Sequence, residues 1–179
     1  MRVIRTLIIA AVIVIGATVG FIYSGLYNVA ATVPHTAPVY WALDTLVDRS
    51  MERHAKGIEV PNLADPARVR VGFDHYNEMC VVCHGAPGHA KSELAQGLYP
   101  QPPDLAESVK DLSPEELFWT IKNGIKMTGM PAWGPTHSDD KIWAMVAFLE
   151  TLPGMTPAQY QAMAAKAGPG DDHGHDHAH

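Results

Sequence analysis

Two thiols and an imidazole stand close together in the stretch Cys80-Val81-Val82-Cys83-His84. One helical turn between the cysteines would put both sulfurs where they can bond to the two vinyl-derived carbons of a haem, and the next residue supplies a ring nitrogen for iron. The pattern predicts one haem c bound covalently through Cys80 and Cys83, with His84 as an iron ligand. A protein with this group would carry electrons.

A Cys-x-x-Cys pair has two other uses, as a redox-active dithiol or as half of a zinc site. The chain contains only 2 cysteines, so no second pair is present to complete a zinc site. A thioredoxin-like dithiol would sit in an alternating strand and helix pattern, which the surrounding sequence does not show. Haem attachment is therefore the favoured interpretation.

The segment from Leu7 to Leu26 contains no charged residue. As a helix it would span roughly 30 Å, the thickness of a hydrocarbon core. Arg2 and Arg5 precede it, and the first acidic residue, Asp44, follows it, which places the N-terminus in the cytoplasm. The prediction is a single-pass membrane protein whose chain after Tyr27 lies on the outer side of the membrane. The alternative, a signal peptide cleaved near residues 29–31, is less favoured because the apolar run is longer than a typical signal core.

Charge limits the choice of partners. All 19 acidic residues follow the apolar segment, together with all but two of the 13 basic residues. This negative balance makes nucleic acid an unsuitable partner. It favours docking to positively charged faces of redox partner proteins, where charge steers the encounter.

The rest of the chain consists of predicted helices and the loops between them. After Pro34 and Pro38, residues 39–56 form an amphipathic pattern that would lie on the membrane surface or brace the domain. Asp65 and Pro66 open a helix that should run to about Met79 and deliver the cysteines at its end. The Gly- and Pro-rich stretch from 85 to 105 is long for a loop unless it wraps a bulky group.

Three further helices carry N-terminal caps in the sequence. Ser113 and Glu116 form a capping box before a helix that stops at residues 123–124, and Ser138 precedes an apolar helix through Leu149. Thr156 and Gln159 form a second capping box before a short helix to residue 167. The tail from Gly168 is polar and is not expected to fold alone.

This order of parts, about residues 66–152, resembles class I monohaem cytochromes c of the membrane-anchored bacterial type. The resemblance implies an all-α, cytochrome c-like domain wrapped round one covalent haem, preceded by a single N-terminal transmembrane helix. It also implies a place in the bacterial inner membrane, with the C-terminal domain in the periplasm. The expected division is 1–29 for the cytoplasmic stub and anchor, 30–64 for the juxtamembrane helix and linker, 65–153 for the cytochrome c domain and 154–179 for the last helix and tail.

The resemblance also implies particular roles for residues. Met130, in the sequence Gly129-Met130-Pro131, matches the family's sixth iron ligand, with Met127 as the competitor. Pro103 matches the proline whose carbonyl accepts the proton on the second nitrogen of the proximal histidine, with Pro102 close enough to compete. The first and last helices should pack through a pair like Gly72 and Tyr76, against the stripe of Trp143, Val146 and Ala147.

Three functional hypotheses follow. With His84 and Met130 on iron no position is open, so the first is a tethered one-electron carrier of clearly positive potential, between a periplasmic dehydrogenase or quinol-oxidising complex and a terminal oxidase or reductase. The second is a haem protein whose labile Met ligand admits peroxide or nitric oxide. The third adds a tail that buffers copper, nickel or zinc through alternating histidines, His173, His175, His177 and His179.

The remaining histidines are expected to be surface or hydrogen-bonded side chains, and not ligands. Among them, a loop residue such as His89 would be required for an iron with two histidine ligands. The five are His35, His54, His75, His89 and His137.

Overall fold

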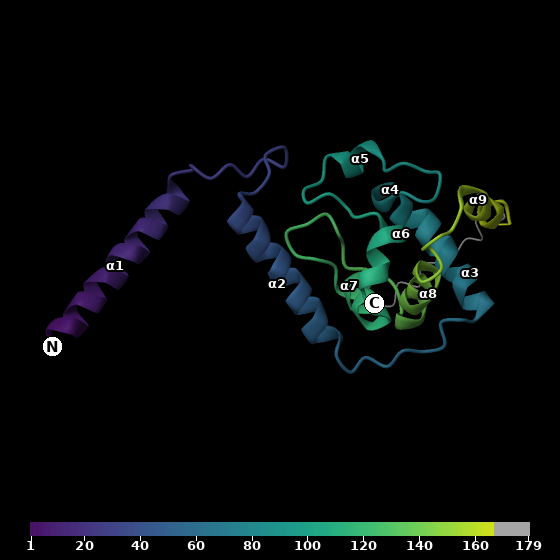
Figure 1. Cartoon of the computed structure of the whole chain (residues 1–179), viewed down its shortest axis with the longest axis horizontal. Coiled ribbons are helices and arrows are strands. Elements are labelled where there is room, and N and C mark those ends of the chain that lie inside the picture. The colour runs from purple at the N-terminus through teal and green to yellow at the C-terminus, as the bar shows by residue number, and fades with distance from the viewer. Residues whose placement is uncertain (167–179) are drawn as a thin grey trace. The chain divides into compact units, whose positions relative to one another are not determined.

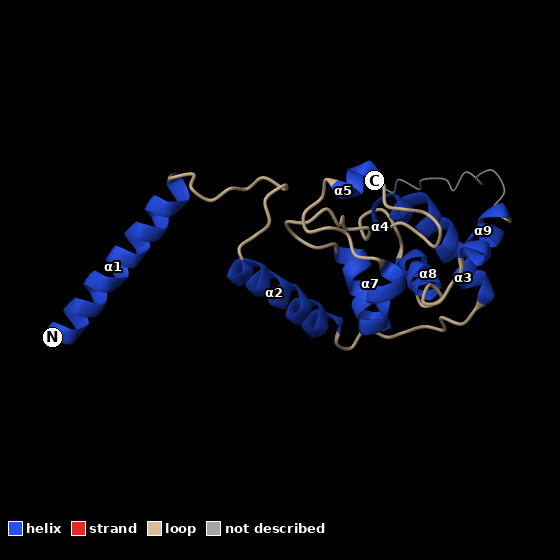
Figure 2. Cartoon of the chain, turned by 45° about the horizontal axis from the view of Figure 1, so that its top comes forward, coloured by secondary structure: helices blue, strands red, loops and turns tan. Residues whose placement is uncertain are grey.

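A computed structural model describes residues 1–166, and its elements over that range are helices joined by loops, with one isolated β-bridge and no strand (Figure 2). This confirms the all-α prediction. The chain divides into two compact units, residues 1–34 and the remainder from His35 onward, which are described separately.

The first unit consists of helix α1, Arg2–Tyr23, and a short following segment. By length and composition α1 could cross a membrane, a criterion that N-terminal signal sequences also meet. It starts before the predicted apolar run, because the arginines do not interrupt a helix, and it ends before Leu26. The Ser24 hydroxyl donates to the Phe21 carbonyl at 2.7 Å, and Gly25 follows at φ +65°.

In the second unit, helix α2, Ala37–Ala55, packs against α7, Pro114–Asn123 (Figure 1). Thr120 Oγ1 lies 3.1 Å from the buried Met51 sulfur, and the rings of His54 and Trp119 stack with centroids 5.4 Å apart. Pro38 does not precede the helix but occupies its first turn, where a missing N–H costs nothing. This packing agrees with the expected bracing of the domain, and the other expected role, lying on the membrane surface, stays a prediction.

The turn that carries Cys80, Cys83 and His84 closes a long helical run made of α3, Pro66–His75, a π-helical segment η1, Tyr76–Cys80, and α4, Val81–His84. The Asp65 side chain accepts from the Ala67 N–H at 3.0 Å, as the sequence predicts for an N-cap. The π segment was not predicted. Because a π turn contains an extra residue, it rotates the cysteine-bearing turn relative to the face that carries Gly72.

Helix α8, Asp139–Leu149, crosses α3 at very short range. A Cβ built on Gly72 would lie 1.8 Å from the Ala144 carbonyl oxygen and 2.9 Å from Phe148 Cβ. The expected contact of Gly72 and Tyr76 with the stripe that begins at Trp143 is therefore wrong in register. Gly72 and Tyr76 meet Ala144 and Phe148, with the Tyr76 and Phe148 rings 5.0 Å apart.

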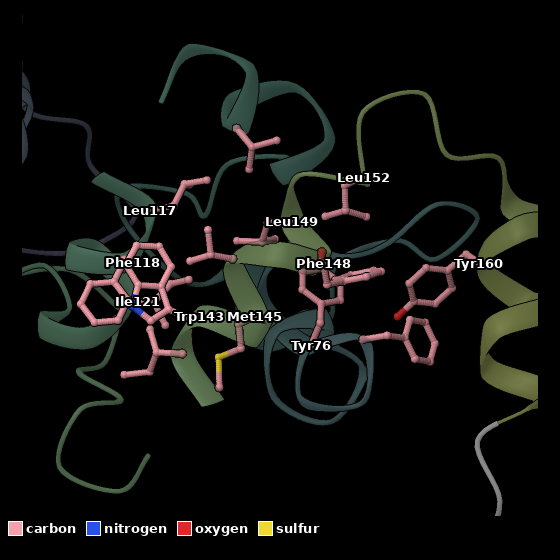
Figure 3. Close-up of a cluster of buried hydrophobic side chains, with 14 residues drawn as sticks. Tyr76, Leu117, Phe118, Ile121, Trp143, Met145, Phe148, Leu149, Leu152 and Tyr160 are labelled. Atoms are coloured by element: carbon pink, nitrogen blue, oxygen red, sulfur yellow. The ribbon is translucent and has the colours of Figure 1, made fainter. Parts of the chain in front are cut away.

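The expected stripe of Trp143, Val146 and Ala147 is buried, but Trp143 packs against α7 and not against α3. The ring of Trp143 stacks on Phe118 of α7, with centroids 4.2 Å apart and planes at 17° (Figure 3). Val146 and Ala147 are almost fully buried in the same helix. A helix enclosed on several sides has no polar face, so the sequence pattern could not show which of its apolar residues meets α3.

The remaining short elements are α5, Glu93–Gln96, α6, Leu105–Ser108, and the 3-10 turn η2, Val109–Asp111. Both predicted capping boxes are present, at Ser113 before α7 and at Thr156 before α9, Pro157–Ala165. The Ser138 side chain makes no capping hydrogen bond to α8. The buried core joins α3, η1, α7, α8 and α9 (Figure 3) and includes Phe73, Tyr76, Leu117, Phe118, Ile142, Trp143, Phe148, Leu152 and Tyr160.

Candidate haem-binding site

Cys80 ends the π segment and Cys83 lies in the following turn of α4, and both are free thiols with partly buried side chains. Burial, with a smaller contribution from neighbouring Cys83, raises the pKa of Cys80 to about 12. A redox-active Cys-x-x-Cys requires a lowered thiol pKa, so the environment of Cys80 disfavours the dithiol interpretation.

His84 is the last residue of α4, and its Nδ1 lies 3.0 Å from the Pro103 carbonyl oxygen. A carbonyl can only accept, so Nδ1 carries the proton and Nε2 keeps its lone pair. Burial lowers the pKa of His84, and the hydrogen bond to Pro103 only partly opposes this. The ring is therefore held as a neutral imidazole with one defined nitrogen able to bind a metal.

The backbone just after His84 is fixed by a buried side chain that sequence reasoning had treated only as packing. The Tyr76 hydroxyl donates to the Gly85 carbonyl at 2.7 Å. Burial raises the pKa of Tyr76, so the hydroxyl keeps its proton. Gly85 has φ +71°, and a Cβ there would lie 2.8 Å from the His89 carbonyl oxygen, so this turn requires glycine.

The long loop after the turn folds back on it. Ser92 Oγ donates to the Val82 carbonyl at 2.5 Å, which pins the loop to α4. Further along, the Lys91 ammonium donates to the Pro102 carbonyl. Both members of the alternative Pro102/Pro103 pair are thus engaged, and only Pro103 is bonded to His84.

The loop that contains Met130 is held by backbone contacts at both ends. The Ile125 N–H donates to the Met130 carbonyl at 3.2 Å, and the Trp133 N–H donates to the Ile121 carbonyl at 3.1 Å. A Cβ on Gly124 would lie 2.8 Å from the Met130 carbonyl oxygen, and the φ of Gly124 is +64°. This close approach places Met130 over the end of α7.

The two candidate methionine ligands differ sharply in environment. Met130 is partly buried and packs against the hydrophobic core. Met127 is 89% exposed and has a left-handed backbone, φ +62°. Met130 is therefore the methionine that the fold brings into the domain.

The histidines outside the turn occupy varied positions. His75 is buried on α3, 7% exposed, with its ring 5.4 Å from that of His137. His89 is exposed, and its ring lies 5.7 Å from the Tyr160 ring. The backbone N–H of His35 donates to the Tyr99 hydroxyl at 3.0 Å.

The predicted tail metal site lies outside the described residues. Its four histidines, His173, His175, His177 and His179, belong to the range 167–179. Within residues 1–166 no group of three His, Cys, Asp or Glu side chains is arranged to hold a metal ion. The tail hypothesis remains a prediction.

The donor set fits a haem c. It comprises two free thiols one turn apart, a neutral imidazole with one committed nitrogen, and a partly buried thioether on a separate loop. An all-helical domain with this turn and this order of helices defines a class I monohaem c-type cytochrome.

Comparison with known families agrees with this class. Residues 67–149 match the family described as cytochrome C oxidase, cbb3-type, subunit III. The cytochrome c domain implies haem c, electron transfer and redox partners. No curated protein matches the chain.

Proposed function

We propose that the chain is a membrane-tethered one-electron carrier that holds one haem c covalently through Cys80 and Cys83. His84 would bind iron through Nε2, and Met130 would provide the opposite ligand. The observation that carries this proposal is the 3.0 Å contact between His84 Nδ1 and the Pro103 carbonyl, on the same helical turn as both thiols. When bound, the haem supplies a reversible Fe(III)/Fe(II) couple.

The residues favour electron transfer over reaction at iron. The Pro103 carbonyl fixes the orientation of His84 and strengthens it as a donor, and the Met130 thioether is a soft ligand that favours reduced iron. Two protein ligands leave no position for substrate, which favours a carrier over an enzyme for peroxide or nitric oxide. A positive reduction potential is expected.

The anchor would be α1, which is long and apolar enough to cross a membrane. Arg2 and Arg5 at its start favour a cytoplasmic N-terminus and a periplasmic domain at the bacterial inner membrane. The partners proposed are a periplasmic dehydrogenase or quinol-oxidising complex as donor and a terminal oxidase or reductase as acceptor. Tethering would confine the search for these partners to the membrane plane.

The test is reduction of the purified full-length protein, in detergent, by candidate donor complexes in a stopped-flow spectrometer. The proposal predicts fast reduction by a membrane donor and reoxidation by an oxidase or reductase, without consumption of peroxide or nitric oxide. Turnover of peroxide or nitric oxide that survives repeated purification would overturn the carrier function.

A further inference from the structure

Two consecutive prolines form the segment that accepts the His84 hydrogen bond. Proline has no backbone N–H, so Pro102 and Pro103 cannot anchor their own segment through donated backbone hydrogen bonds. Their carbonyls are the remaining polar backbone groups. The Pro103 carbonyl accepts from His84, and the Pro102 carbonyl accepts from the Lys91 ammonium.

The backbone beside Lys91 is itself attached to the haem-binding turn. Both the N–H and the hydroxyl of Ser92 donate to the Val82 carbonyl, at 3.3 and 2.5 Å. Lys91 therefore starts from a point fixed on α4 and reaches the proline segment. The hydrogen bonds of Ser92 and Lys91 therefore connect α4 to the proline segment, and the His84 hydrogen bond connects that segment back to α4.

Lys91 also brings charge to this side of the domain. Its side chain is partly buried, so its ammonium is less screened than that of a surface lysine. The ammonium is bonded to the carbonyl of Pro102, the residue next to the proline that accepts from His84, so its positive charge lies near the His84 ring. A nearby positive charge disfavours additional positive charge on a metal bound to that imidazole.

From these contacts we propose that Lys91 is a positioning residue for the proximal ligand and a determinant of the reduction potential. Its ammonium holds the Pro102–Pro103 carbonyls in place for His84, and its charge favours the reduced over the oxidised iron. This inference rests on the proposed haem ligation by His84.

Three substitutions separate the two effects. Lys91→Arg keeps both the charge and the donor, Lys91→Gln keeps a donor without charge, and Lys91→Met keeps neither. Lys166→Gln, at the exposed end of α9, is the matched control for loss of one positive charge. The midpoint potential of each full-length, haem-loaded protein is measured by spectroelectrochemical titration at low and high salt.

The potential should be unchanged in Lys91→Arg and Lys166→Gln and lower in Lys91→Gln and Lys91→Met, with the decrease persisting at high salt. In the reduced protein, exchange of the His84 Nδ1 proton with solvent, followed by NMR, should rise about fivefold in Lys91→Met and less in Lys91→Gln. Equal potentials and equal exchange rates in Lys91→Gln and Lys166→Gln would overturn the inference. If Lys91→Met does not accumulate, the potentials and exchange rates of Lys91→Arg and Lys91→Gln still test the role of Lys91.

The outcome for the proposed function is separate. A wild-type protein that binds no haem would refute the function itself. A wild-type protein with haem on His84 and unresponsive Lys91 variants would refute only the role of Lys91.

Discussion

The backbone of Gly72 touches the backbone of Ala144: a Cβ at Gly72 would lie 1.8 Å from the Ala144 carbonyl oxygen. No side-chain rotation can relieve such an overlap, because the atom met is main chain. The crossing of α3 and α8 therefore depends on the absence of a side chain at Gly72. The same helical run carries Cys80, Cys83 and His84, so the crossing also positions the turn proposed to bind haem.

Gly72→Ala should force the two helices apart and lower the free energy of unfolding by about 2–3 kcal/mol. Denaturant unfolding of the haem-loaded protein measures the loss. Gly97→Ala is the control, since a Cβ there meets only the Leu94 carbonyl oxygen at 3.5 Å, an ordinary contact. Equal stabilities of the two variants would contradict the described crossing.

Substitutions of Met130 and Met127 should affect the haem spectrum and the reduction potential differently. Met130→Ala should abolish the weak near-infrared charge-transfer band of a Met-ligated ferric haem and lower the reduction potential, because the soft ligand is lost. Met127→Ala should leave both unchanged, since that side chain is 89% exposed. Loss of the band in Met127→Ala alone would reverse the assignment.

The sequence predicted the elements whose signals are local. The Asp65 cap and the capping boxes at Ser113 and Thr156 are all found where adjacent residues indicated them. These signals depend on side chains that bond to backbone within three residues, so they can be read without the fold.

What the sequence did not predict depends on contacts between distant residues. The π segment at Tyr76–Cys80 has no local signature. The partner of Gly72 was misjudged because α8 is apolar on every side after its charged first turn. The Lys91 contact with Pro102 joins two loop residues eleven positions apart, with no periodic pattern between them. The two consecutive prolines were the only available hint, since their carbonyls need outside donors.

Helix α2 should contribute directly to the stability of the cytochrome domain. Met51 is 7% exposed and accepts from Thr120, so Met51→Ala should cost about 2–3 kcal/mol of unfolding free energy. Leu46→Ala is the control on the same helix, because Leu46 is 65% exposed and should change stability little. If α2 instead binds only the membrane surface, Met51→Ala will leave the stability in detergent unaltered.

Ionisation of the buried Tyr160 should lower the stability of the protein at alkaline pH. Burial raises the pKa of Tyr160 from about 10 to about 12, and its hydroxyl donates to Asn77 Oδ1 at 2.9 Å. The unfolded chain therefore loses this proton at lower pH than the folded protein does. The stabilisation of the fold by the protonated Tyr160 hydroxyl is fully present below pH 10 and is lost progressively as the pH rises toward 12.

Unfolding free energies measured across this range should fall less steeply for Tyr160→Phe than for the wild type. The wild type and the variant are compared at each pH, so that alkaline changes common to both cancel. Parallel pH profiles would show that Tyr160 ionises as an exposed phenol.

Covalent haem attachment at Cys80 and Cys83 is tested most directly by the intact mass of the full-length protein, made in a host that matures c-type cytochromes and denatured before measurement. The account predicts a mass larger than that of the polypeptide by one haem, which stays attached in denaturant and is absent when both cysteines are replaced by serine. A colourless wild-type protein with the mass of the bare polypeptide would contradict it.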